Sequence, residues 1–434
     1  MQICIAVEVP SVVERKRSME ITRGYKVELD VNNRQRSLLL QCAGVMRWAW
    51  NWGLARRKAE YASIGKSSNA VEQHRQLNAL KALEYPWLYN YSKCIPQEAL
   101  RDLDKAYQNF FRRVKNGEKK VGFPEFKSRK RSIGSFRLTG AIRVKDTRIK
   151  LPCIGWLRLK EHGYIPIKDI HILSATVSEK AGHWFVSVQC REEIEVTQAT
   201  GETIGIDLGI KTMAVVSDKR EFKNPKALRK AQHKLARLQR ELARRQRGGQ
   251  NWKKTKAKIA YLHYRIANIR ADSLRKVTTA ICATTKPDDE RPAMVAIEDL
   301  NVAGMLNNHC LARAIADVGM GEFRRQIEYK TLWSGEMLFV ADRFFPSSKL
   351  CPDCGCINSE LKLSDRIWIC NCGAVHDRDL NAACNLKDLA IRTMSSMETS
   401  HCGETLAESD IRPTAASLAA SVKQESSIES QLRF

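Results

Sequence analysis

One acidic residue inside an apolar segment constrains the fold of this chain more than any other feature. Asp207 lies between Ile206 and Leu208 in the run Thr-Ile-Gly-Ile-Asp-Leu-Gly at 203–209, which has the composition of a buried strand. A carboxylate that is buried without a partner is costly, so a cation must lie near it. An ordinary structural role explains Asp207 poorly, and we expect it to belong to a functional site.

Two further acids stand where predicted elements end or begin. Glu298 follows the apolar run at 293–297, and Asp379 begins the last predicted helix, at about 379–393. Both have ordinary alternatives: Glu298 could be a surface acid at a strand end, and Asp379 or its neighbour Asp377 could cap the helix. If the three acids converge on one point, they repel one another unless Mg²⁺ neutralises them.

The order of the predicted elements favours one arrangement of these acids. Along the chain, the strand of Asp207 is followed by a second strand, two helices and then the strand of Glu298. After Glu298 come a helix, a strand and finally the helix that Asp379 begins. This order suits a ribonuclease-H-like α/β fold, whose central sheet brings strand carboxylates together. Three carboxylates are the ligand set for two-metal phosphodiester hydrolysis, in which one metal activates water and the other stabilises the leaving oxygen. The remaining elements are predicted at 213–217, 311–333 and 336–341.

Two cysteine pairs predict a structural zinc site. Cys351-Pro-Asp-Cys354 and Cys370-Asn-Cys372 are 15 residues apart and resemble the two knuckles of a tetrahedral Cys4 site, although the second pair is one residue shorter than the usual spacing. We expect one Zn²⁺ on these four residues, with no open coordination position. Cys356 is a spare thiol that we do not expect to bind, and four buried, unliganded cysteines are the alternative.

The charge balance indicates a polyanionic partner. The 434 residues include 73 Lys and Arg against 48 Asp and Glu, a net charge of +25, which is too large for an ordinary metabolic enzyme. No stretch approaches the ~20 apolar residues that a membrane span needs, so no membrane partner is expected. The start of the chain lacks a basic region before its apolar run, which argues against a signal peptide. The 14 cysteines are scattered, which suits reduced thiols and a cytoplasmic protein of the prokaryotic cytosol or nucleoid.

Positive charge concentrates in two segments. The segment 112–148 is densely basic and contains Phe123, Phe126 and Phe136, a pattern that favours phosphate contact over a merely solvated face. The segment 226–276 predicts two amphipathic helices that fold back through a Gly-Gly turn. Their outer faces are almost entirely Lys and Arg, so this basic hairpin would repel itself unless a polyanion lay against it.

The first half of the chain predicts a helical module and then a small barrel or sheet. A helix is expected at about 33–61, and helical stretches continue to about 113. Trp48 and Trp52 would share a face of the first helix while Trp50 points elsewhere; we favour core packing for them over base stacking. Short alternating runs at 136–138, 142–144, 149–151, 156–159, 170–177 and 184–188 predict strands.

Four motifs resemble those of a known family. They are Gly-Ile-Asp-Leu-Gly-Ile-Lys at 205–211, Ala-Ile-Glu-Asp-Leu-Asn at 296–301, Arg-Phe-Phe-Pro-Ser-Ser-Lys-Leu-Cys-Pro-Asp-Cys-Gly at 343–355 and His-Asp-Arg-Asp-Leu-Asn-Ala-Ala at 376–383. They look like TnpB, the transposon-encoded RNA-guided nuclease related to compact type V CRISPR effectors. The resemblance is specific over 203–389. It is fainter at 47–54, similar to the family's first recognition helix, and at 123–128.

The resemblance implies a multidomain α+β protein. Asp207, Glu298 and Asp379 would be the split catalytic triad of a RuvC-like nuclease, and the cysteines would lie in its zinc-binding insert, which binds the target nucleic acid. A guide RNA from the transposon end would direct cleavage of double-stranded DNA beside a short transposon-adjacent motif. The expected parts are a leader at 1–20, a wedge-like β-barrel at 21–200 with a helical recognition insert at about 33–115, the nuclease domain at 201–394 with its zinc-binding insert at 346–376, and a disordered tail at 395–434.

Three functions are therefore compared. The leading one is an Mg²⁺-dependent RNA-guided DNA endonuclease, which we expect to act as a monomer. The second is a relative that binds guide and target without cutting and acts as a repressor, and the presence of all three acids argues against it. The third is a strand-transferring transposase, which the same metal chemistry could serve.

Overall fold

The computed structural model describes residues 17–118, 121–362 and 365–400. The chain divides into two compact units, one spanning Glu20–Glu193 and the other containing Met1–Met19 and Ile194–Phe434. Residues 1–16 of the expected leader and 401–434 of the expected tail lie outside the described residues. Within the described residues, no helix has both the length and the apolar character to cross a membrane.

The strands of the first unit form a seven-stranded sheet. Its order is β2-β6-β7-β1-β5-β4-β3, which leaves β2 and β3 at the two edges, so the described strands form an open sheet where a small barrel was expected. Edge strands of four and three residues offer few backbone groups for a closing ladder. The strands are β1 (Arg17–Asp30), β2 (Ser135–Leu138), β3 (Arg143–Lys145), β4 (Arg148–Leu151), β5 (Gly155–Leu159), β6 (His171–Lys180) and β7 (His183–Val196).

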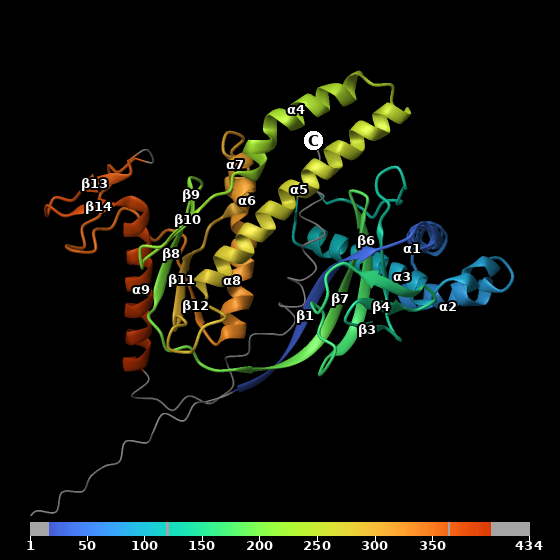
Figure 1. Ribbon diagram of the computed structural model, residues 1–434, viewed down its shortest axis with the longest axis horizontal. Helices are drawn as coiled ribbons and strands as arrows, with labels where there is room; N and C mark the ends of the chain where they lie inside the picture. The colour runs from blue at the N-terminus through green and yellow to red at the C-terminus, as the bar shows by residue number, and fades with distance from the viewer. Residues whose placement is uncertain (1–16, 119–120, 363–364, 401–434) are drawn as a thin grey trace, which may run out of the picture. The chain divides into compact units, whose positions relative to one another are not determined.

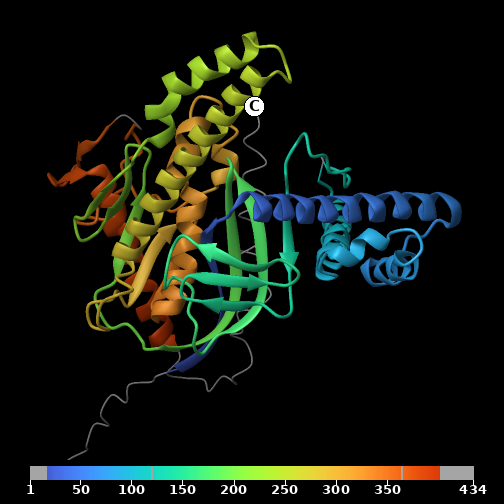
Figure 2. The ribbon, with the colours of Figure 1, turned by 45° about the vertical axis from the view of Figure 1, so that its right-hand side comes forward.

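The helices of this unit lie between β1 and β2 in the chain. They are α1 (Asn33–Ile64), α2 (Ala70–Lys81), the 3-10 helix η1 (Pro86–Asn90) and α3 (Cys94–Lys115), which Figure 2 shows beside one another. A capping box between Asn32 and Gln35 begins α1. Gly53 allows α1 and α3 to approach closely, because a Cβ there would lie 2.5 Å from a methyl group of Leu100.

The three tryptophans of α1 divide as the helical spacing predicts. Trp48 and Trp52 stack with ring centroids 6.4 Å apart and pack, partly buried, against the core. Trp50 points elsewhere: it is buried, and its indole N–H donates to the Glu125 carbonyl at 2.9 Å. These contacts agree with the packing interpretation of all three residues.

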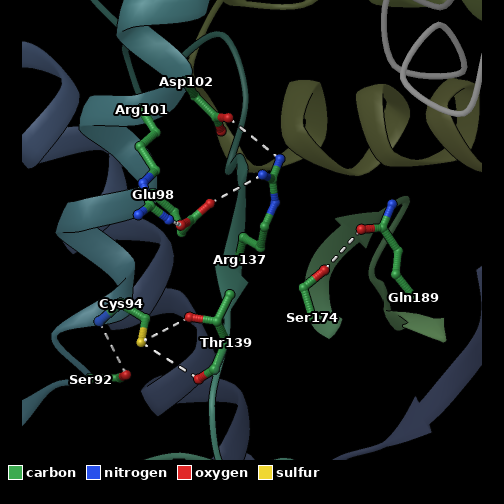
Figure 3. A network of polar contacts seen from close by, with 9 residues as sticks. All are labelled: Ser92, Cys94, Glu98, Arg101, Asp102, Arg137, Thr139, Ser174 and Gln189. Atoms are coloured by element: carbon green, nitrogen blue, oxygen red, sulfur yellow. Dashed lines mark hydrogen bonds and ion pairs between the residues drawn. The ribbon is translucent and has the colours of Figure 1, made fainter. Parts of the chain in front are cut away.

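A buried carboxylate connects the helices to the sheet. Glu98 of α3 is 5% exposed and bonds to Arg101 at 2.5 Å and to Arg137 of β2 at 3.1 Å. Figure 3 shows these pairs, with Asp102 on the other side of the Arg137 guanidinium and Cys94 near Thr139. The network fixes α3 against β2 because each charge within it has an opposite partner.

The second unit contains a mixed five-stranded sheet in the order β10-β9-β8-β11-β12. β8 pairs antiparallel with β9, and β9 with β10, whereas β11 lies parallel to both β8 and β12. The strands predicted at 203–209, 213–217, 293–297 and 336–341 are all confirmed. They are β8 (Ile204–Leu208), β9 (Thr212–Val216), β11 (Met294–Glu298) and β12 (Met337–Ala341), and the sheet also contains β10 (Glu221–Lys223), which was not predicted.

Helices cover both faces of this sheet (Figure 1). Leu274 of α5 and Phe323 of α8 pack on one face, and Leu386 and Ala390 of α9 pack on the other. The remaining elements are the helix α4, the short helices α6 and α7, and a two-stranded ribbon. The bounds are α4 (Ala227–Arg244), α5 (Gln250–Ile281), α6 (Val302–Met305), α7 (Ala312–Val318), α8 (Met320–Ser334), β13 (Ile367–Ile369), β14 (Val375–Asp377) and α9 (Arg378–Ser400).

Two helix predictions need correction. The single helix expected at 311–333 is divided into α7 and α8 by Gly319, whose φ of +80° ends α7 in the left-handed region. The last helix was expected to end near residue 393, but α9 continues through Ser400, beyond the predicted start of the tail at 395. At the other end of the chain, β1 begins at Arg17, inside the expected leader.

We predict that Glu98→Ala lowers the free energy of unfolding by about 1–3 kcal/mol, because charge-assisted hydrogen bonds to two arginines are lost. Urea unfolding of the full chain, monitored by circular dichroism, measures the change. Glu118→Ala is the matched control: its pair with Arg113 is exposed on both sides and should contribute at most about 1 kcal/mol. Equal effects of the two substitutions would contradict the role given to Glu98.

Candidate active site and metal centre

Two neighbouring parallel strands carry two of the predicted acids to one edge of the five-stranded sheet. In the β8–β11 pair, Ile206 lies opposite Ile297, so Asp207 and Glu298 are the next residues on adjacent strands. Both side chains are half-buried. Because parallel strands end at the same sheet edge, the structure brings these two carboxylates close together.

The third predicted acid comes from α9, which packs directly on β8. A Cβ at Gly205 would lie 2.0 Å from the Ala383 carbonyl oxygen and 2.6 Å from the Lys387 nitrogen, so the strand and the helix backbone meet without a side chain between them. Only glycine fits this approach. It places Asp379, in the first turn of α9, near the strand acids.

Asp377, and not Asp379, caps this helix. The backbone N–H groups of Asp379 and Leu380 donate to Asp377 Oδ1 at 3.1 and 3.0 Å. The capping role that the sequence left open for either acid is thus filled by Asp377. The Asp379 carboxylate is left to make tertiary contacts.

Asp379 forms an ion pair with Arg366, which directly precedes β13. Arg366 Nη1 donates to both carboxylate oxygens of Asp379, at 2.9 and 2.8 Å. The three acids do not form one tight cluster: among the described residues, the tight groups of possible metal ligands include the cysteines but not this triad. One of the three carboxylates is instead neutralised by an arginine.

The electrostatics of Asp207 show that the acids act on one another. Burial, followed by the negative charges of Glu298 and Asp379, raises the pKa of Asp207 to about 8. Arg378 and Arg366 oppose this shift without cancelling it. The repulsion among the acids therefore adds to the effect of burial on Asp207.

Side chains that sequence reasoning missed fix the loop before the first cysteine. The Ser347 hydroxyl donates to Glu298, and the Ser347 carbonyl accepts from Asn385 Nδ2 at 2.7 Å. Asn381 and Asn385, one turn apart on α9, both donate to the Leu350 carbonyl. The signal that could have found them is two asparagines spaced i,i+4 on a helix, because such a pair presents amides on one face.

The four predicted cysteines form a compact sulfur cluster. The Sγ atoms of Cys351, Cys354, Cys370 and Cys372 all lie within 4.8 Å of one another, with Cys351 to Cys372 at 3.8 Å and Cys354 to Cys370 at 3.4 Å. A tetrahedron with Zn–S bonds of ~2.3 Å has S–S edges of about 3.8 Å, so this set fits zinc. Cys356, the spare thiol, is exposed and outside the cluster.

His376 was not predicted and touches this cluster. Its Nε2 lies 3.2 Å from Cys351 Sγ, and Cys351, Asp353 and His376 form a second group of possible ligands. Although burial raises the pKa of Cys351, hydrogen bonds from the Cys354 backbone and from His376 lower it to about 6. The pKa values of Cys354, Cys370 and Cys372 are raised instead.

The basic hairpin is the coiled pair of helices that the sequence predicts. α4 and α5 pack through Leu238, Leu262 and Ile266, and Gly248 with φ +88° turns the chain between them. Buried Asp317 fixes the pair: it accepts from the Leu228 backbone N–H at 3.0 Å and from Arg270 at 2.9 Å.

A groove of about 400 Å³ runs along the hairpin. Four cationic side chains line it, and its acid, Glu241, already pairs with Arg245. Four cations around a single compensated acid form a surface suited to phosphates. The lining residues are Lys234, Arg237, Leu238, Glu241, Lys258, Tyr261, Leu262 and Arg265.

The aromatic residues of the basic segment 112–148 serve two purposes. Phe136 is 1% exposed and belongs to the core of the first unit. Phe123 and Phe126 are 43% and 48% exposed, and the Lys58 ammonium lies 5.4 and 5.1 Å from their ring centroids. Only these two phenylalanines therefore offer rings at the surface beside a cation.

Comparisons with known families cover three parts of the chain. Residues 175–309 match a family described as "Probable transposase", and residues 321–386 match "Cas12f1-like, TNB domain". Residues 19–66 match "Helix-turn-helix domain". In the structure, that last range contains most of β1, the long helix α1 and the turn after it.

Relatives match almost the whole chain. It is 35% identical over 416 residues to the "Putative RNA-guided DNA endonuclease" of Streptomyces pristinaespiralis, covering 94% of this chain and 96% of the relative. It is 31% identical to the "Putative RNA-guided DNA endonuclease InsQ" of Escherichia coli K12, covering 85% and 92%.

A solved structure supports the fold. The chain superposes on the protein of a Cas12f1–sgRNA–target DNA complex with a TM-score of 0.51 and 12% identity, covering 85% of this chain and 99% of that one. The relatives match this chain over nearly their full length, and two family descriptions match the two halves of the second unit. With the likeness of fold, these matches confirm the resemblance expected from the sequence. The chain belongs to the TnpB family.

Proposed function

We propose that this protein is an RNA-guided DNA endonuclease that hydrolyses target DNA at Asp207, Glu298 and Asp379, beside a short transposon-adjacent motif. The observation that supports the proposal is that the three acids lie near enough for Glu298 and Asp379 to act on Asp207. Two come from adjacent parallel strands, and the third comes from the helix packed on Gly205. The sheet, with three antiparallel strands continued by two parallel ones, supports a ribonuclease-H-like, RuvC-type nuclease domain.

The donor set fits divalent cations. Hard carboxylate oxygens are the ligands that Mg²⁺ prefers. Burial first, and then the negative charges of Glu298 and Asp379, raise the pKa of Asp207, and a bound cation would offset that repulsion between the acids. In the metal-free protein this raised pKa contributes stability that is complete below pH 3.8 and is lost as the pH rises through about 8. Two bound Mg²⁺ ions would supply the activated water and stabilise the leaving oxygen.

The chain itself positions this chemistry. β8 and β11 fix the spacing of Asp207 and Glu298, and Ser347 orients Glu298 by donating to its carboxylate. The Asp377 cap begins α9 and so sets where Asp379 stands. These contacts preorganise the ligands, which is what a hydrolytic site needs from its scaffold.

The basic surfaces account for the guide and the target. In RNA-guided recognition, base pairing reads the sequence while the protein holds the heteroduplex by its backbone and shape. The groove along α4 and α5 carries four cations suited to that backbone contact. The sulfur cluster, which we assign to one structural Zn²⁺, would hold the ribbon β13–β14 beside α9.

We predict that Asp207→Asn abolishes cleavage. The protein is produced with RNA from its flanking locus and given plasmids with a matched target beside randomised flanking sequence. The wild type should make guide-dependent double-strand breaks, and the variant should lose activity by at least about 10³-fold, because metal-dependent stabilisation of several kcal/mol is lost. Asp218→Asn, an exposed acid paired with Arg220, should cut normally.

The same assay separates the competing functions. Tight, guide-dependent binding by the wild type without any cleavage in Mg²⁺ would favour a repressor. Strand joining without RNA would favour a transposase, the activity named in the description of one matching family. Either result would overturn the endonuclease proposal.

We predict one zinc per chain, which native mass spectrometry measures. Cys351→Ser should lose it, whereas Cys356→Ser, outside the cluster, should keep it. Because the pKa values of three of the four thiols are raised, zinc binding near neutral pH should release about three protons per chain and tighten as the pH rises. A metal content that is unchanged in Cys351→Ser would refute this assignment.

We predict that the double substitution Arg237→Ala and Arg265→Ala weakens guide RNA binding. Loss of two phosphate contacts should reduce the slope of log affinity against log salt by about 1.5. Filter binding over a range of salt concentrations measures the slope. Lys276→Ala is the control, because Lys276 is an exposed cation of α5 outside the groove and paired with Asp272. An unchanged slope in the double variant would exclude the groove as an RNA contact.

A further inference from the structure

The ribbon β13–β14 connects the sulfur cluster to the acid group. Its far end is the turn of Cys370 and Cys372, where the Cys370 N–H donates to the Ala374 carbonyl at 2.8 Å. Its near end leads directly into α9, because Asp377 is both the last residue of β14 and the helix cap. A shift of this ribbon would therefore also move Asp379.

Arg366 stands at the near end of the ribbon, beside the start of α9. Its carbonyl accepts from the Arg378 N–H at 2.7 Å, which extends the ladder that pairs Ile367 with Asp377. This backbone position holds the Arg366 side chain over Asp379. The Arg366 side chain is 46% exposed and that of Asp379 is 23% exposed, so the guanidinium has room to turn away.

The ion pair engages both oxygens of Asp379, the atoms through which this carboxylate would bind a metal. Arg366 Nη1 donates to both oxygens of the carboxylate. A carboxylate whose two oxygens both accept hydrogen bonds from one cation binds a second cation less strongly. The positive charge of Arg366 also acts on Asp207, favouring the ionised form of that carboxyl. Arg366, together with Arg378, thus partly neutralises the charge that a divalent cation would neutralise at this group of acids.

We propose that Arg366 is a positioning residue that competes with the divalent cation for Asp379. With the site metal-free, the pair keeps Asp379 oriented and partly relieves the repulsion between the acids. When a cation binds, its charge repels the guanidinium, and Arg366 must release Asp379. This inference rests on the proposed metal site and adds to it an intramolecular competitor carried by the zinc-binding insert.

The competition predicts a direct effect on metal affinity. The probe is Mn²⁺, titrated into the zinc-loaded, RNA-free full chain, with free Mn²⁺ measured by electron paramagnetic resonance. Arg366→Ala should tighten Mn²⁺ binding by about threefold to tenfold, because a partly exposed, doubly hydrogen-bonded ion pair no longer has to be broken. Arg366→Lys, which keeps a positive charge that can still pair with Asp379, should tighten it less.

Arg378→Ala is the matched control for charge. Arg378 lowers the pKa of Asp207 more than Arg366 does, but its guanidinium donates to the Lys362 carbonyl and not to Asp379. We expect less than a twofold change in its Mn²⁺ affinity. Equal tightening in Arg366→Ala and Arg378→Ala would overturn direct competition in favour of a general charge effect. Unchanged or weaker binding in Arg366→Ala would overturn it as well.

Thermal unfolding supplies a second measurement. Without metal, Arg366→Ala should melt below the wild type, and saturating Mn²⁺ should reduce the difference, because the pair is already broken in the metal-bound state. A difference that stays constant would assign Arg366 a purely structural role. Asp207→Asn tests the site itself: Mn²⁺ binding that is unaffected by this substitution would overturn the proposed metal site and the competition together.

Discussion

The contact between β8 and α9 at Gly205 is the constraint on which the candidate site depends. Strand and helix backbones meet there so closely that a Cβ would lie 2.0 Å from the Ala383 carbonyl oxygen. This approach brings the start of α9, and with it Asp379, to the edge where Asp207 and Glu298 stand. Acids that repel one another are held together by apolar packing elsewhere, chiefly Leu386 and Ala390 against the sheet.

Charge is distributed in two opposing ways along the chain. The net charge of +25 concentrates on surfaces such as the groove of α4 and α5, where it suits nucleic acid backbones. The acids form a small negative site inside this positive protein. Positive surfaces of this kind attract a polyanion, and in the proposed function the acids would hold the cations that cleave it.

Local patterns were sufficient to predict the parts that local physics determines. The apolar run around Asp207 predicted a strand, and the i,i+3/i+4 leucines of α4 predicted the hairpin, because buried positions recur with the period of the secondary structure. The functional role of Asp207 stays a prediction. The helix at 311–333 was wrong because a glycine within a helical pattern does not reveal its φ. Only the structure shows that Gly319 adopts +80°.

Tertiary contacts were beyond the reach of such patterns. No sequence pattern near Arg366 predicts its ion pair with Asp379, 13 residues further along the chain. The pair forms only because the ribbon turns back at the cysteines. The same holds for Ser347 on Glu298 and His376 on Cys351. The open sheet order of the first unit also follows from which short strands pair, and alternation alone does not determine pairing.

The most direct test of the central claim is to locate the bound cation. Fe²⁺ loaded in place of Mg²⁺, with ascorbate and peroxide, generates hydroxyl radicals that cut the polypeptide near the metal, and mass spectrometry identifies the cuts. If the three acids hold one metal centre, cuts should cluster around Asp207, Glu298 and Asp379, and excess Mg²⁺ should suppress all of them together. Cuts elsewhere, or cuts near these residues that Mg²⁺ does not suppress, would contradict the account.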